Sequence, residues 1–124
     1  MEQKKTVNVL WVSRHNMTPE QYGDLERIAG GKVQLHQYDA TVRNAEDLRE
    51  SIASADIIAV VLPVDIMSQV LKMAGTKPVI QSVNERVPTG QAKVLDNGKT
   101  ENEYRFVHAY WEQMLKIEIE TKRL

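Results

Sequence analysis

Residues 7 to 21 read Val-Asn-Val-Leu-Trp-Val-Ser-Arg-His-Asn-Met-Thr-Pro-Glu-Gln, an apolar run followed by a polar cluster. The apolar part, Val7 to Val12, is short and rich in residues that favour a buried strand. Thr18 is then predicted to cap a helix, with Pro19 at its first position and Gln21 completing a capping box. A strand, a polar loop and a helix start in this order are typical of ligand sites in α/β proteins.

Strand and helix signals alternate along the next part of the chain. The alternating residues 33 to 38 predict a half-exposed strand near a sheet edge, and Asn44 is predicted to cap the helix that follows. The apolar run 57 to 62 predicts a central strand, Asp65 is predicted to cap a third helix, and residues 78 to 83 predict a fourth strand. We therefore expect an α/β fold: a single Rossmann-like domain over residues 1–124, with a mainly parallel sheet and helices on both faces.

The pattern changes in the last third of the chain. Residues 84 to 90 are predicted to form a loop, and the Asn-Gly pair within residues 92 to 100 predicts a small hairpin. Apolar residues between 106 and 115 recur with helical spacing, which predicts an amphipathic helix that places Phe106, Tyr110 and Trp111 in the core. Residues 116 to 121 alternate strictly and predict an edge strand, although continuation of the helix is the alternative.

Composition excludes several classes of function. The chain has 42% hydrophobic and 27% charged residues, as soluble globular proteins do, and its net charge of -1 gives no field for binding long duplex nucleic acid or an anionic membrane. The absence of cysteine excludes disulfides and thiolate metal sites. No cofactor or metal site is expected, since the three histidines lack ligand spacing. No targeting or membrane-spanning segment is recognisable, so a cytoplasmic location is expected.

The predicted site lies at the carboxyl ends of the strands, where open α/β sheets bind ligands. Two arginines there are suited to a phosphate or carboxylate, and the histidine is a candidate general base. The predicted ligand-binding residues are Ser13, Arg14, His15, Asn16, Asp65, Ser82, Asn84 and Arg86. Each also has a structural interpretation: Asp65 as a helix cap, His15 as a solvated loop residue, and the arginines as partners of surface acids such as Glu85.

The sequence of residues 13 to 21, placed after a strand, resembles the opening of small CRISPR-associated Rossmann-fold (CARF) proteins. The resemblance covers about Val7 to Ile28. It implies a homodimer that binds a cyclic oligoadenylate across its two subunits, either as a sensor or as a ring nuclease. In a metal-free ring nuclease, a ribose 2′-hydroxyl would attack the adjacent phosphate, with Arg14 or Arg86 stabilising the developing charge and His15 as the base.

Two other functions are compatible with the sequence. The chain could be a non-enzymatic module that dimerises or docks a partner through its aromatic segment and its last strand. It could also act on a small phosphorylated or carboxylated metabolite through the same loops. Dinucleotide-binding, P-loop and α/β-hydrolase sites are disfavoured, because the G-x-G-x-x-G, Walker A and G-x-S-x-G patterns are all absent.

Overall fold

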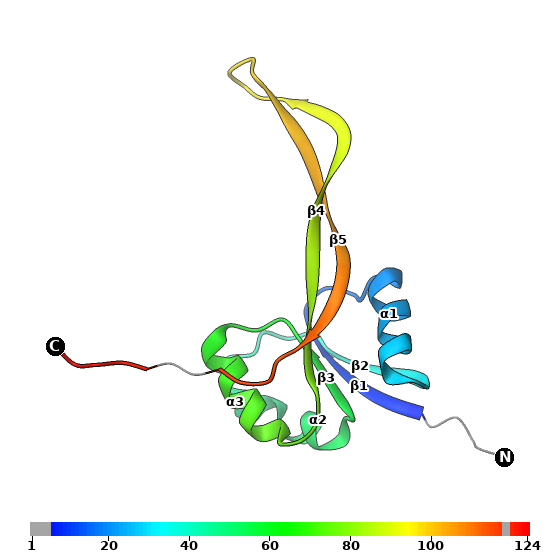
Figure 1. The fold of residues 1–124 in the computed structure, drawn as a ribbon, viewed down its shortest axis with the longest axis vertical. Helices are drawn as coiled ribbons and strands as arrows, with labels where there is room; N and C mark the ends of the chain where they lie inside the picture. Colours follow the sequence, from blue (N-terminus) through cyan, green and yellow to red (C-terminus); the bar gives the residue numbers. More distant parts are fainter. Residues whose placement is uncertain (1–5, 118–119) are drawn as a thin grey trace.

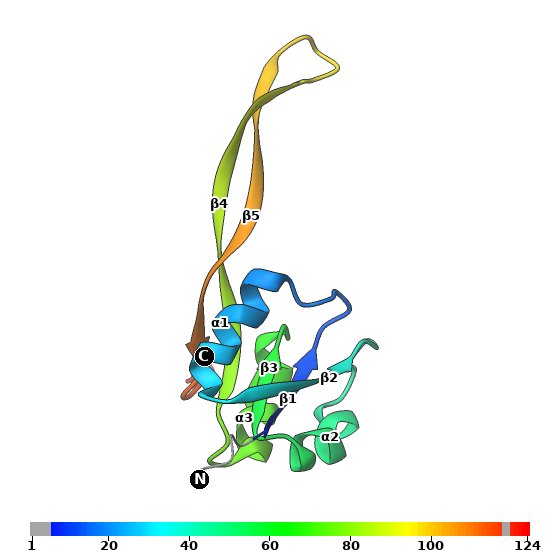
Figure 2. The same cartoon turned by 90° about the vertical axis from the view of Figure 1, so that its right-hand side faces the viewer.

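A computed structural model describes residues 6–117 and 120–124 and shows an α/β body from which a long β-hairpin projects (Figure 1; Figure 2). Its elements are β1 (Thr6–Val12), α1 (Pro19–Ala29), β2 (Lys32–Tyr38), η1 (Ala45–Leu48), α2 (Arg49–Ser54), β3 (Ile57–Val60), α3 (Val64–Ala74), β4 (Val79–Val94) and β5 (Thr100–Gln113). Within the described residues the strands form one sheet in the order β2-β1-β3-β4-β5. The first four strands are parallel and β5 is antiparallel to β4, so the α/β prediction is confirmed but the sheet is mixed.

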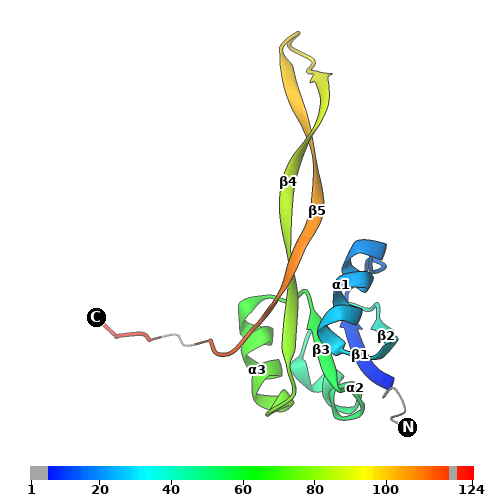
Figure 3. The ribbon, with the colours of Figure 1, turned by 45° about the vertical axis from the view of Figure 1, so that its right-hand side comes forward.

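Helices cover both faces of the sheet, as predicted (Figure 3). On β1, Val9 and Trp11 belong to a buried cluster that includes Leu25 of α1. The alternate residues Leu10 and Val12 belong to a second buried cluster, formed with η1, α2 and α3. This alternation explains why residues 9 to 12 of β1 are all apolar, because both faces of the strand are buried there.

Two of the predicted helix caps are confirmed. The Thr18 hydroxyl accepts from the Gln21 amide at 3.1 Å, while Gln21 Oε1 accepts from the Thr18 amide at 2.9 Å. Asn44 Oδ1 accepts from the Glu46 amide at 3.0 Å and caps η1. The predicted cap at Asp65 is wrong, because α3 begins one residue earlier with Pro63 as its N-cap. Asp65 lies exposed in the first turn, where its charge favours the helix dipole.

The largest correction concerns residues 84 to 115. Residues 84 to 90 are not a loop, because β4 continues through them, and residues 106 to 113 form part of β5 instead of a helix. The Asn97-Gly98 turn is confirmed, but it closes a hairpin far longer than predicted, with Gly98 at a φ of 79°. Cross-strand pairing overrides the helical spacing of the apolar residues. The predicted strand over 116 to 121 is absent from its described residues, and residues 118–119 lie outside them.

We call residues 84–107 the arm. Most of its side chains are exposed, whereas the roots of β4 and β5 lie in the body. The register of the arm is irregular between Pro88 and Ala92, where Gly90 has a φ of 82°. No helix in the described part of the chain is long and apolar enough to cross a membrane.

Trp111 anchors β5 to the body. Its side chain is 8% exposed, meets Trp11 edge-on with ring centroids 6.0 Å apart, and donates to the Gln21 carbonyl at 3.0 Å. The neighbouring Tyr110 is 51% exposed, as expected for adjacent residues on opposite faces of a strand. The core prediction is therefore confirmed for Trp111. It is wrong for Tyr110, which lies on the opposite face of β5, and for Phe106, which lies on the arm and is 75% exposed.

Replacing Trp111 with alanine is expected to lower the free energy of unfolding by about 3–5 kcal/mol, because it leaves a cavity against Trp11. Tyr110→Ala is the matched control on the same strand and is expected to cost about 1 kcal/mol or less. Urea unfolding measures both. Similar losses for the two variants would contradict the strand geometry and favour a helix that buries both side chains.

Candidate functional site

The predicted loop Ser13 to Asn16 follows β1. It lies beside the topological switch point of the sheet, where β2 follows on one side of β1 and β3 follows on the other. Gln37 Nε2 donates to the carbonyls of Ser13 at 3.1 Å and His15 at 3.2 Å. Trp11 Nε1 also donates to the His15 carbonyl, at 2.9 Å. The backbone of the loop is thus held in place while the side chains of Arg14, His15 and Asn16 are exposed.

The other predicted site residues lie in two places, the first turn of α3 and β4 near the root of the arm. Asp65 lies in the first turn of α3, and Arg86 lies on the arm, where its guanidinium stacks 3.7 Å from the centroid of the Tyr104 ring. Ser82 and Asn84 lie on β4, where they join a polar network with α1 and β5. The structure therefore does not form a second polar loop opposite Arg14. A ligand-binding role for these residues stays a prediction.

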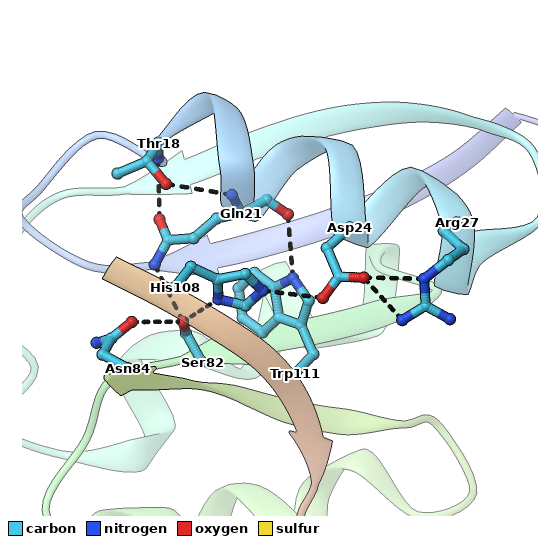
Figure 4. A network of polar contacts seen from close by, with 8 residues as sticks. All are labelled: Thr18, Gln21, Asp24, Arg27, Ser82, Asn84, His108 and Trp111. Carbon is cyan, nitrogen blue, oxygen red and sulfur yellow. Dashed lines mark hydrogen bonds and ion pairs between the residues drawn. The ribbon is translucent and has the colours of Figure 1, made fainter. Parts of the chain in front are cut away.

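The polar network connects β4, β5 and α1 at the root of the arm (Figure 4). His108 lies at its centre: its Nε2 is 2.9 Å from Asp24 Oδ2, and its Nδ1 is 2.5 Å from Ser82 Oγ. Ser82 Oγ donates to Asn84 Oδ1 at 3.1 Å and accepts from Gln21 Nε2 at 3.2 Å. Three elements distant in sequence are thus joined by one chain of hydrogen bonds.

A β-bulge directs His108 into this network. Val83 pairs with Tyr110 and Asn84 pairs with His108, so Ala109 is an extra residue on β5. In a regular strand, residues three apart point to opposite faces, yet His108 and Trp111 both contact α1. The bulge reverses the alternation and turns His108 towards Asp24, as bulges commonly do where a side chain must be redirected.

The protons of the network follow from its donors and acceptors. Ser82 has one hydroxyl proton, which it donates to Asn84 Oδ1, and its oxygen accepts from Gln21 Nε2. The Asp24 carboxylate only accepts, so the hydrogen bond with His108 requires a proton on His108 Nε2.

The pKa of Asp24 is lowered from its ordinary value, mainly by the hydrogen bond from His108. Desolvation opposes this shift, while Arg27 adds to it through hydrogen bonds of 2.9 Å and 2.7 Å to Asp24 Oδ1. Asp24 thus binds both Arg27 of its own helix and His108 at the root of the arm.

Ser82, His108 and Asp24 have the composition of a hydrolytic triad, but their geometry does not activate the serine. In a hydrolytic triad the base accepts the serine proton, whereas here the Ser82 hydroxyl donates to Asn84 Oδ1. The His108 side chain is also only 4% exposed. The network therefore fixes the root of the arm to α1 instead of presenting a nucleophile.

A separate cavity of about 310 Å³ lies between the end of β2 and α2. Its lining includes His36, Tyr38 and Glu50. The carboxylate of Glu50 makes it a poor site for an anion. No three histidine, aspartate or glutamate side chains in residues 6–117 and 120–124 gather in a way that could hold a metal ion.

Sequence reasoning missed Asp24 and His108 as partners. Gln21 and Asp24 are three residues apart on α1, which indicates a shared polar face. His108 carried no such signal, because its orientation depends on a bulge that the sequence does not reveal. The chain matches no protein-family model, no curated protein and no solved structure, so the site rests on its own geometry.

Asp24→Asn is expected to destabilise the protein at neutral pH, because it removes the charge that His108 and Arg27 share. Since folding lowers the pKa of Asp24, the stabilisation is fully present above the ordinary value of 3.8 and is lost as pH falls through the lower folded-state pKa. The stability difference between wild type and variant should therefore shrink below about pH 4. Urea unfolding across pH 2–7 measures it, with the exposed Glu26→Gln as control. A difference that is constant with pH would contradict the network.

Proposed function

We propose that this chain is a protein interaction module that binds a protein partner through its arm. The observation that carries the proposal is an exposed aromatic patch on an otherwise uncovered two-stranded ribbon. Arg86, Pro88, Tyr104 and Phe106 lie on one face of the arm, and Phe106 is 75% exposed. We call these four residues the arm patch. Partner docking through the aromatic segment is one of the functions compatible with the sequence, and in the structure that segment is a strand instead of a helix.

Physical considerations favour a covered arm. A two-stranded ribbon is marginally stable alone in water, because neither of its faces is buried. Tyrosine, phenylalanine and arginine are enriched at the centres of protein interfaces, and Arg86 is already oriented by Tyr104. Covering Phe106 alone would contribute about 1.5–3 kcal/mol of hydrophobic free energy.

The charge of the arm favours a protein over a nucleic acid. Its basic residues are Arg86, Lys93, Lys99 and Arg105, and its acidic residues are Glu85, Asp96, Glu101 and Glu103. The arm is therefore neutral, whereas ribbons that bind nucleic acid neutralise phosphates with an excess of positive charge. Alternating charges of both signs suit a polar rim around an aromatic centre.

A photo-crosslinking amino acid placed at position 106 tests this function in the cells that naturally produce the protein. We expect a discrete protein adduct at position 106 and none at position 69 on α3, where the exposed Gln69 serves as the control site. Mass spectrometry identifies the adduct. Equal yields at the two positions, or no adduct at either, would overturn the proposal.

A second candidate function is the binding of a small anionic ligand, as the Rossmann-like and CARF-like interpretations imply. The observation that favours it is the position of Ser13 to Asn16 beside the topological switch point between β1 and β3, where open α/β sheets bind ligands. Arg14 is exposed there and forms no ion pair with the described residues. A cyclic oligoadenylate, bound by a homodimer or cleaved with His15 as base, is the ligand this candidate specifies.

Labelled cyclic tetra-adenylate and hexa-adenylate test the second candidate. Arg14→Ala is expected to weaken binding about tenfold or more, since a hydrogen bond to a charged group contributes about 1.5–3 kcal/mol. Lys72→Ala, which removes an exposed cation from the last turn of α3, should leave binding unchanged. Linear products lost in His15→Ala would indicate a ring nuclease. No binding of either compound to the wild type would exclude this function.

A further inference from the structure

We infer that the partner of the arm is a second copy of this chain, joined by antiparallel pairing of the two β5 edges around Tyr104. The inference rests on the proposed function and adds the identity of the partner. It is carried by three features of the arm: an open strand edge, the direction of the backbone groups at Tyr104, and a charge pattern that is complementary to itself.

The open edge belongs to β5. This strand ends the sheet order, and no other described strand covers its outer side. Its residues, Thr100–Gln113, include neither proline nor glycine, the residues that usually protect an edge or weaken a strand. The opposite edge of the arm is protected, because Pro88 of β4 lacks an amide proton. Pairing is thus favoured at one edge only.

The backbone groups of Tyr104 face this open edge. The Glu103 carbonyl accepts from Thr89 Oγ1 at 3.3 Å and therefore faces β4. Because N–H and C=O groups alternate in direction along a strand, those of Tyr104 face outward. Tyr104 pairs with Pro88, which agrees with this direction, since proline is tolerated where the ladder needs no donor.

A two-fold axis at Tyr104 makes the charges of the two edges complementary. In antiparallel self-pairing, residues equally far before and after the axis lie opposite each other. Arg105 then faces Glu103 of the second copy, and the same pair repeats across the axis. An axis at Glu103 or at Arg105 would instead oppose two like charges, which destabilises a sheet. Among these registers, the one centred on Tyr104 is favoured.

The same register joins the two arm patches. With the axis perpendicular to the sheet, Tyr104 of one copy lies opposite Tyr104 of the other. Both Phe106 side chains then lie on the same face of the joined sheet. The result is a four-stranded sheet with one continuous aromatic strip, which is far more stable than two separate ribbons. Gln113 lies nine residues from the axis, roughly 30 Å along the strand at 3.4 Å per residue. The two bodies therefore lie at opposite ends and do not collide.

Charge reversal tests the inference on the full chain. Size-exclusion chromatography with light scattering is expected to show a dimer. Arg105→Glu and Glu103→Arg should each raise the dimer dissociation constant about tenfold or more, because each places two like-charged pairs across the axis. The double variant should restore it to near the wild-type value. Glu85→Arg, the same charge change on β4 of the arm, is the control and should leave the constant unchanged.

Each other outcome overturns the inference. A wild type that stays monomeric at the highest concentration reached, or a dimer that the single reversals do not weaken, excludes pairing at this edge. A double variant that is not restored excludes the register centred on Tyr104. If the adduct at position 106 is a different protein, the second copy is excluded while the proposed interaction function stands. If position 106 gives no adduct, the interaction function itself fails.

Discussion

The docking of β5 on α1 is the interaction on which the rest of the structure depends. Trp111 fills the space beside Trp11, and His108 binds Asp24, so one strand is held to one helix by an apolar and a polar contact. Both contacts require the bulge at Ala109, because without it the two side chains would point to opposite faces. One extra residue thus converts an ordinary antiparallel edge strand into an anchored one.

This anchoring explains how a small body can support a long projection. The arm buries little of its own surface, so its stability must come from its root or from a partner. At the root, Gln21 contributes twice: its Oε1 closes the capping box of α1, and its Nε2 donates to Ser82 on β4. The start of α1 and the base of the arm are therefore fixed by the same side chain.

The sequence predicts the body well and the arm poorly, for a physical reason. The strand at Val7 to Val12, the capping box at Thr18 and the buried Trp111 follow from local patterns, and each is confirmed. Residues 106 to 113 have helical spacing only because their apolar side chains serve two environments: Trp111 lies in the body, while Phe106 is exposed on the arm. No local pattern distinguishes this mixture from an amphipathic helix.

The candidate site divides in the same way. The polar loop at Ser13 to Asn16 is readable from a strand and a capped helix, and it lies where the topology rule places it. Ser82 was also singled out by the sequence, but its partners Asp24 and His108 were not. Ser82 and His108 are 26 residues apart in sequence, and Asp24 and His108 are 84 residues apart, so no short motif encodes their association.

The continuity of the arm in sequence has a consequence for how the protein folds. The pairings from Val94 with Thr100 down to Asn84 with His108 can form by zipping from the Asn97-Gly98 turn, with no long loop to close. The strands of the body instead require crossovers between distant segments, which is the slower kind of assembly. The arm can therefore pair quickly, but the paired ribbon is stable only once its root is docked on α1.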